Sequence, residues 1–187
     1  MAPKAKKHER RCARESALAL LYSSDITERD VVRIVEEGTY PADDVEFPAY
    51  AEALVRGVHE HRVALDDYLA STSENWAIDR MPVVDRAILR LATYEMLYVD
   101  TVPISVTISE AVELAKAYGG EDESSRFVNG VLGRIALKLE AEAAAGAAAD
   151  GAGDGTAGAE AGNEPVDAAP AGESAVSSES SVLAGGE

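Results

Sequence analysis

Basic and aromatic side chains share one side of the helix that the first part of the sequence predicts. At about 100° per residue, five side chains fall within a sector of about 80°. Lysine and arginine bind phosphates, and this binding gains free energy because condensed counterions are released. An exposed tyrosine ring can stack on an unpaired base. The residues of this predicted single-strand-binding face are Lys7, Arg11, Arg14, Leu18 and Tyr22.

The residues around this face are also basic. The first fourteen residues contain six lysine or arginine residues and a single acid, Glu9, although the whole chain has a formal net charge of −17. A basic segment on an acidic protein favours a polyanionic partner. We expect Arg11 and Arg14 to face solvent. The spacing also allows a solvated charged face without a ligand, which would end in a half-buried Tyr22.

The last part of the chain differs in composition from the rest. Residues 141–187 contain sixteen alanines, nine glycines and nine acidic residues, with no lysine or arginine. Such a segment has too little bulky apolar surface to offset the entropy of ordering it. The sequence therefore predicts a basic arm at 1–8, a folded domain at 9–140 and a disordered acidic tail at 141–187.

Few side chains suggest other chemistry. Cys12 is the only cysteine, which excludes an intrachain disulfide and a thiolate metal cluster. His59 and His61 are two residues apart, so their side chains diverge on a helix and do not predict a metal site. Phosphate-binding glycine motifs and a nucleophile elbow are absent. We therefore predict a protein that is not an enzyme and that takes no cofactor or metal.

The apolar runs also bear on location. None approaches the ~20 residues that a membrane-spanning helix needs. The run at Ala17–Tyr22 is too short for the apolar core of a secretory signal. We therefore expect a cytoplasmic protein with no membrane partner.

Apolar residues recur at spacings of three and four, which is typical of amphipathic helices. The pattern predicts an all-α domain of about seven helices. The sixth has Tyr118 at the end of its apolar stripe. The segments that carry the first six predicted helices are His8–Ser24, Val31–Val35, Tyr50–Val58, Ala64–Ser71, Pro82–Tyr98 and Ile108–Tyr118. The last predicted helix starts near Ser124 or Ser125 and runs through Leu139.

Start and stop signals accompany several of these helices. Thr27 with Asp30, and Thr107 with Glu110, have the spacing of a capping box, which predicts the starts of the second and sixth helices. Glycines end the same two predicted helices: Gly38 ends the second, and Gly119-Gly120 ends the sixth, where they predict a left-handed C-terminal cap.

Glu95 falls on the apolar stripe of the predicted fifth helix. A carboxylate is costly there unless it is paired. We therefore predict a structural carboxylate that is bonded to an arginine or to a helix N-terminus, in preference to a catalytic acid.

A set of short motifs resembles the NusB family of transcription antitermination factors. The resemblance covers roughly residues 9–139, and its C-terminal motifs are specific, whereas the N-terminal one is weak alone. It implies an all-helical fold of two helical subdomains. The motifs are Arg11–Glu15 (R-x-A-R-E), Leu21-Tyr22, Leu89-Arg90, Tyr94-Glu95, Val102-Pro103, Ser109–Lys116 and Phe127–Leu132.

The resemblance also implies a function. Members of the family bind a boxA-type sequence in nascent RNA together with NusE, a ribosomal protein of the small subunit. The assembly acts with other Nus factors on the elongating RNA polymerase, chiefly on ribosomal RNA operons. The RNA contacts that the resemblance implies are Lys7, Arg10, Arg11, Arg14, Tyr22, Asp122, Ser124 and Phe127.

The partner site and one RNA contact need a separate remark. The resemblance implies that NusE docks on the C-terminal subdomain, where Asp85 matches a typically acidic position. Phe127 also lies on the apolar stripe of the last helix, so core packing is an alternative role for it.

Two other functions remain open from the sequence. A NusB-like domain also serves as the RNA-binding part of ribosomal RNA cytosine methyltransferases, but the tail of this chain cannot form the cofactor-binding domain that such an enzyme needs. A helical protein–protein adaptor would leave the basic face without a ligand. Salt distinguishes the adaptor from an RNA-binding protein, because RNA binding weakens steeply as salt rises.

Overall fold

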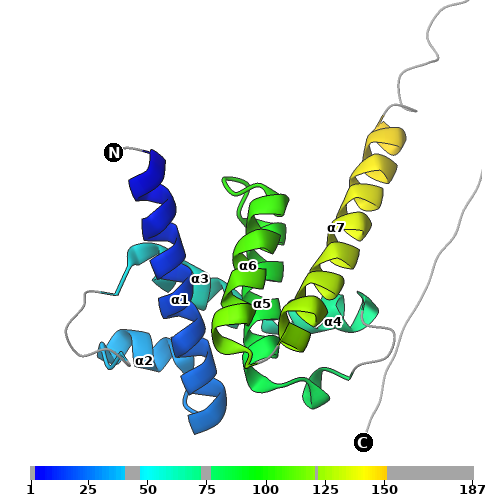
Figure 1. The fold of residues 1–187 in the computed structure, drawn as a ribbon. Coiled ribbons are helices and arrows are strands. Elements are labelled where there is room, and N and C mark those ends of the chain that lie inside the picture. Colours follow the sequence, from blue (N-terminus) through cyan, green and yellow to red (C-terminus); the bar gives the residue numbers. More distant parts are fainter. Residues whose placement is uncertain (1–2, 41–46, 73–76, 121, 151–187) are drawn as a thin grey trace, which may run out of the picture. The chain divides into compact units, whose positions relative to one another are not determined.

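The structure is a computed structural model that describes residues 3–40, 47–72, 77–120 and 122–150, with side chains described except at 3–6, 122 and 147–150. In these ranges the chain forms seven α-helices and one short 3-10 helix, and no strand (Figure 1). This confirms the predicted all-α class. The elements are α1 (Pro3–Thr27), α2 (Val31–Glu37), α3 (Ala49–Glu60), α4 (Arg62–Thr72), η1 (Ile78–Arg80), α5 (Val83–Tyr98), α6 (Ile104–Tyr118) and α7 (Asp122–Asp150).

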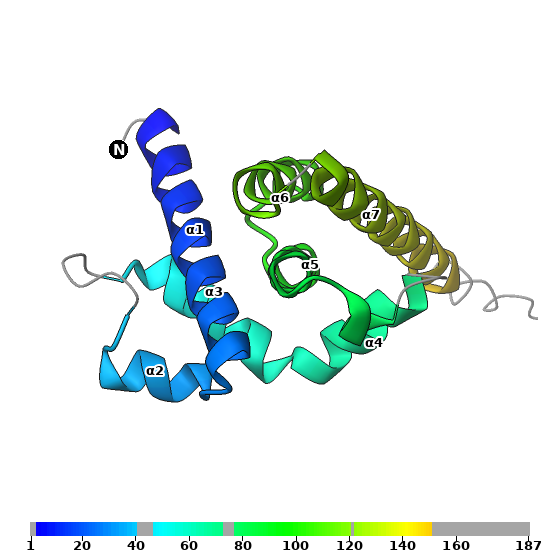
Figure 2. The same ribbon diagram turned by 60° about the horizontal axis from the view of Figure 1, so that its bottom comes forward.

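The helices form two groups around α5. Helices α1, α2 and α3 pack on one another, while α4, α6 and α7 pack with α5. Helix α5 also contacts α1 and α3, so it lies between the groups, as the view nearly along its axis shows (Figure 2). The two helical subdomains that the resemblance implied are therefore present.

Helix α1 is covered on two sides. Its predicted apolar stripe is buried at Ala13, Ala17 and Leu20, and its largest contacts are with α3 on one side and with α5 on another. Arg14 and Leu18, which the sequence placed on the outward face, are buried as well. A helix with two packed neighbours leaves a narrower solvent face than a single amphipathic stripe predicts.

The start of α2 differs in detail from the prediction. Its N-cap is Asp30, whose carboxylate accepts hydrogen bonds from the backbone N–H groups of Val32 (2.8 Å) and Arg33 (3.3 Å). Thr27 instead ends α1 and donates to the carbonyl of Ser23 (2.7 Å). The capping box was therefore wrong, because the aspartate itself caps the helix.

The end of α2 agrees with the prediction. Gly38 ends the helix in the left-handed conformation, with φ 64°. A residue without Cβ adopts this conformation at little cost, so the glycine stop is confirmed.

Helix α6 begins earlier than predicted. Pro103 is its N-cap and the helix starts at Ile104, so Thr107 and Glu110 lie inside it and are buried. The second capping box was therefore wrong, because these polar side chains serve interior contacts. After α6 only Gly120 is left-handed, with φ 91°, while Gly119 has φ −81°.

Helix α7 runs past the predicted domain boundary. It begins at Asp122 and continues to Asp150, so the boundary near Glu140 falls within a helix. Beyond that boundary, Glu142 accepts a hydrogen bond from the hydroxyl of Tyr68 on α4 (3.1 Å). Residues 151–187, most of the predicted tail, lie outside the described residues. Among the described helices, none is both long and apolar enough to span a membrane.

Candidate nucleic-acid interface

Two hollows lie where α1 faces the C-terminal helices; together we call them the α1–α6 groove. The upper hollow lies beside the first part of α1 and measures about 260 Å³, and the lower one lies further along the helix and measures about 700 Å³. The upper hollow is lined by Lys7, Arg10, Arg14, Val102, Pro103, Val106 and Glu110. The lower hollow is lined by Glu15, Leu18, Ala19, Tyr22, Ser23, Pro82, Val83, Val84 and Tyr118.

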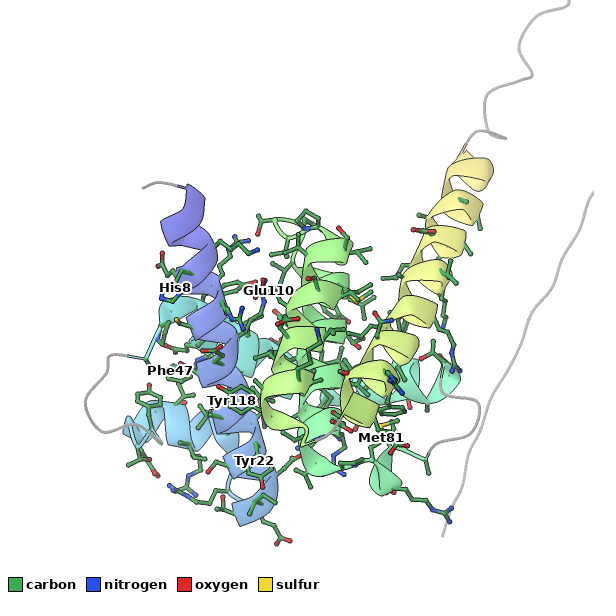
Figure 3. All side chains as sticks on the ribbon, viewed as in Figure 1. His8, Tyr22, Phe47, Met81, Glu110 and Tyr118 are labelled. Carbon is green, nitrogen blue, oxygen red and sulfur yellow. The ribbon has the colours of Figure 1, made fainter. Side chains whose placement is uncertain are left out.

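The lower hollow is apolar and carries two exposed aromatic rings. Tyr22 extends from the end of α1 and is 42% exposed; Tyr118 extends from the end of α6 and is 52% exposed. Figure 3 shows the two side chains on neighbouring helix ends. The expected exposure of Tyr22 is confirmed. The sequence assigned Tyr118 to a buried stripe, and its neighbouring Gly119-Gly120 stop was the only signal that it lies at a helix end.

The upper hollow is basic, and two of its three cations, Lys7 and Arg10, make only weak contacts. Lys7 is 76% exposed, and its Nζ lies 3.9 Å from the Glu110 carboxylate. Arg10 donates to the carbonyl and hydroxyl oxygens of Thr101 (3.4 and 3.2 Å), and its guanidinium stands 5.2 Å from the centre of the Tyr50 ring. Exposed contacts of this kind stabilise a protein little, so a phosphate could replace them at low cost.

Arg11 lies on the same helix, outside both hollows. It is partly exposed and pairs with Glu15 one turn further along α1, with Nε 3.4 Å from Oε1. An ion pair between residues one turn apart on a helix surface stabilises the helix by only about a few tenths of a kcal/mol. Arg11 is therefore available to an external anion.

Arg14 does not face solvent, and that prediction was wrong. It is 5% exposed, and its Nε donates to both carboxylate oxygens of Glu95 (3.0 and 3.2 Å). Nη2 is also 2.8 Å from Oε1, although it lies off the line of a hydrogen bond. The physical reason is the second neighbour of α1, because α5 covers this side of the helix.

Glu95 gathers donors from three other helices. Besides Arg14, it accepts hydrogen bonds from the hydroxyl of Tyr50 on α3 and from Oγ1 of Thr107 on α6 (2.7 Å). The carboxylate is 2% exposed, which confirms a structural carboxylate bonded to an arginine. Burial, with the hydrogen bond to Glu95, raises the pKa of Tyr50 well above its usual value, so its hydroxyl remains a donor.

Of the residues expected near the start of α7, Ser124 is buried and Phe127 is partly buried. Ser124 donates to Asp85, and Asp85 is 4% exposed. Burial raises the pKa of Asp85, and the Ser124 bond partly offsets this. Both side chains are therefore used inside the protein, so their position does not support direct contact with RNA or NusE. Phe127 is partly buried against the core, in line with its alternative role, and the side chain of Asp122 lies outside the described residues.

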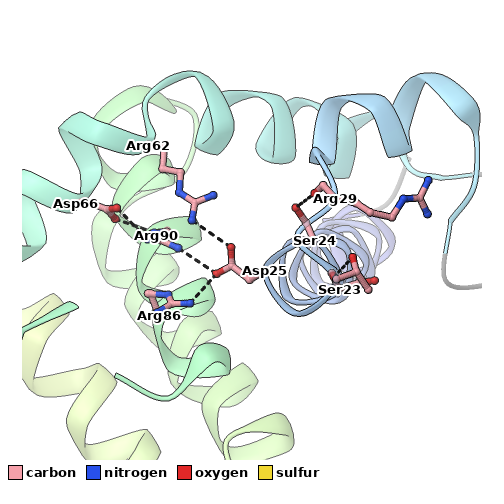
Figure 4. Close-up of polar contacts among 9 residues, drawn as sticks. Ser23, Ser24, Asp25, Arg29, Arg62, Asp66, Arg86 and Arg90 are labelled. Carbon is pink, nitrogen blue, oxygen red and sulfur yellow. Dashed lines mark hydrogen bonds and ion pairs between the residues drawn. The ribbon is translucent and has the colours of Figure 1, made fainter. Parts of the chain in front are cut away.

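A second charged network fixes the far end of α1 (Figure 4). Asp25 accepts hydrogen bonds from Arg62 (3.2 Å), Arg86 (3.2 Å) and Arg90 (3.1 Å). Arg90 also forms a bidentate pair with Asp66 (2.7 and 2.9 Å). The network joins α1 to α4 and α5, and so holds the helix end that carries Tyr22.

The two histidines that were considered as metal ligands lie apart from the groove. His61 stacks on Tyr98 with ring centres 4.1 Å apart, and His59 is exposed on α3. Within the described ranges there is no group of three or more His, Cys, Asp or Glu that could hold a metal ion.

Comparisons with known proteins agree with this geometry. The model of the NusB family matches residues 11–137. The transcription antitermination protein NusB of Bacillus velezensis is 44% identical over 133 residues, which cover 71% of this chain and 99% of that protein. The protein of the same name from Salinispora arenicola is 47% identical over 131 residues, which cover 68% of this chain and 94% of that protein.

Solved structures show the same fold. The T. maritima NusB structure has a TM-score of 0.60 and 40% identity, and the match covers 68% of this chain and 90% of that one. A crystal structure described as the antitermination factors NusB and NusE in complex with dsRNA has a TM-score of 0.56 and 28% identity, covering 68% and 96%. From the family match, the relatives and the helix arrangement together, this chain belongs to the NusB family.

Proposed function

We propose that this chain is a non-enzymatic RNA-binding antitermination factor that holds a short single strand of boxA-type RNA along the α1–α6 groove. The observation that supports it most is the pairing of the two hollows. The upper one presents exposed Lys7 and partly buried Arg10 to phosphates, and the lower one presents Tyr22 and Tyr118 to bases.

The length of the groove suits a short strand. Lys7 and Tyr22 are fifteen residues apart on one helix, which corresponds to about 22 Å along its axis. Phosphates at the upper end would bind Lys7 and Arg10, and Arg11, outside the hollow on the same helix, would bind a further phosphate. Bases at the lower end would stack on the tyrosine rings, which requires that they are unpaired.

The proposed protein partner is a NusE-type ribosomal protein. The solved structure of NusB and NusE that this chain resembles contains the two proteins in complex with dsRNA. Dividing a short RNA between two proteins raises the overall affinity, because the second contact becomes effectively intramolecular. The complex would then act with other Nus factors on RNA polymerase during transcription of ribosomal RNA operons, in the cytoplasm.

A binding titration tests the RNA part of this proposal. Fluorescently labelled boxA-type RNA, a scrambled single strand and a duplex of the same sequence would each be titrated with the full chain, with and without NusE, over a range of salt. We expect the boxA-type strand to bind most tightly, and log K to fall linearly with log salt.

Two results would contradict the proposal. Equal binding of single strand and duplex would mean that unpaired bases are not recognised. A helical adaptor would instead be supported if the chain bound NusE with an affinity insensitive to salt, and if RNA bound neither to the chain alone nor to the chain with NusE.

A further inference from the structure

We infer that Glu95 is a positioning residue for the α1–α6 groove, and that Arg14 serves this carboxylate instead of the RNA. The buried carboxylate sets the rotation of α1 about its axis, and this rotation decides where the basic side chains stand. The inference rests on the proposed RNA binding. It separates the basic residues of α1 into those that contact RNA and one that holds the contact surface in place.

The first argument is the convergence of four helices on one carboxylate. Glu95 of α5 binds Arg14 of α1, Tyr50 of α3 and Thr107 of α6, and it is almost fully buried. Polar interactions are stronger in such surroundings than in water, and an unpaired member is costly. A rotation of α1 by one residue, about 100°, would remove Arg14 from its partner.

The second argument is the set of contacts that connects Glu95 to Arg10 and Lys7. The hydroxyl of Tyr50 binds Glu95, while its ring lies beneath the Arg10 guanidinium. On the other side, the Glu110 carboxylate lies 3.9 Å from Arg14 Nη1 and 3.9 Å from Lys7 Nζ. Lys7 and Arg10, the other two cations that line the upper hollow, are therefore placed by groups that also contact the Arg14–Glu95 pair.

The effect of Glu95→Gln on RNA affinity distinguishes a positioning role from long-range electrostatic attraction. Replacing Glu95 by glutamine makes the chain more positive by one unit, and long-range attraction alone would then tighten RNA binding. If Glu95 positions α1, the same substitution frees buried Arg14 from its anion and disturbs the upper hollow. RNA binding then weakens although the protein is more positive.

The first experiment compares Glu95→Gln with Glu36→Gln, an equal charge change at an exposed position of α2. Binding of a short boxA-type single strand would be followed by fluorescence anisotropy. The concentration of active protein would be fixed by stoichiometric titration, so that loss of folded protein does not count as loss of affinity. We expect Kd to rise about tenfold for Glu95→Gln and to stay equal or fall slightly for Glu36→Gln. Unchanged or tighter binding by Glu95→Gln overturns the inference.

The second experiment is a rescue by the double variant Arg14→Gln with Glu95→Gln. Its net charge equals that of the wild type, and two amides can restore a neutral hydrogen-bonded pair. We expect Kd to return to within about threefold of the wild type, with an unchanged slope of log K against log salt.

A direct contact between Arg14 and a phosphate of the RNA would give a different slope of log K against log salt. If Arg14 binds a phosphate, its removal flattens the slope by about 0.7 and the double variant does not recover. That result overturns the inference while the proposed function stands. Absence of RNA binding by the wild type would contradict the proposed function itself, and the inference with it.

Discussion

The two ends of the α1–α6 groove are built from the same helix but have different chemistry. Four of the seven residues that line the upper hollow are charged, whereas Glu15 is the only charged residue among the nine that line the lower hollow. The upper end therefore offers interactions that salt screens, and the lower end offers stacking that salt affects little. The difference shows how the affinity for one strand can have two parts: an ionic part that falls as salt rises, and a stacking part that salt changes little.

Arg14 gives the largest expected effect, because it belongs to the upper hollow by position but to the interior by burial. Arg14→Ala would leave the Glu95 carboxylate buried without its cation, and we expect the free energy of unfolding to fall by about 3–5 kcal/mol. Urea unfolding followed by circular dichroism measures this.

Arg11→Ala is the matched control for that prediction. Its pair with Glu15 is partly exposed, so we expect a loss of at most about 1 kcal/mol of stability together with weaker RNA binding. Equal stability losses for the two variants would show that burial does not separate these arginines.

Substitutions in the lower hollow should weaken RNA binding without changing its dependence on salt. We expect Tyr22→Ala and Tyr118→Ala each to weaken binding of single-stranded RNA by about 1–3 kcal/mol, because each removes a stacking surface. Tyr98→Ala is the control, since this tyrosine is also exposed but stacks on His61 outside the groove. A flatter salt slope for the groove variants would break the division between the two ends.

Substitutions of cations in the upper hollow should, by contrast, change the salt dependence of RNA binding. Lys7→Ala and Arg10→Ala are each expected to flatten the slope of log K against log salt by about 0.7, with a loss of affinity that shrinks at high salt. Arg33→Ala, an exposed arginine on α2, serves as the control and should leave the slope unchanged. Loss of affinity that is equal at low and high salt would indicate that these cations do not bind phosphates.

The smallest effect is expected from the part of the predicted acidic tail that follows α7. Residues 151–187 carry seven acidic residues and no lysine or arginine, so they can compete with RNA for the basic end of the groove. Removing them should tighten RNA binding by no more than about threefold at low salt and not at all at high salt, where charges are screened. An unchanged Kd at low salt would dispose of this competition.

Much of the fold could be predicted from local sequence. Spacing of apolar residues placed the seven α-helices that the described residues form, because an amphipathic stripe is a property of one segment. Gly38 marked the end of a helix, and Glu95 was recognised as a paired carboxylate, since a charge on an apolar stripe is costly without a partner. The family resemblance added the two subdomains, which periodicity alone does not give.

The starts of helices were predicted less well, for a physical reason. The Thr107–Glu110 spacing fits a capping box, but both side chains face the interior, where Thr107 binds Glu95. A capping motif and a pair of buried polar residues have the same letters in the sequence. Only the neighbouring helix decides between them.

The sequence by itself determined that one helix carries cations and a tyrosine with helical spacing. Only the tertiary structure decided which of them face solvent, because α1 packs against α3 and also against α5, and the position of the second neighbour depends on contacts between distant segments. That second contact buries Arg14 and Leu18 while it leaves Lys7 and Tyr22 exposed. Periodicity indicates one buried side of a helix, whereas the exposed residues of α1 are decided by its packing against two neighbouring helices.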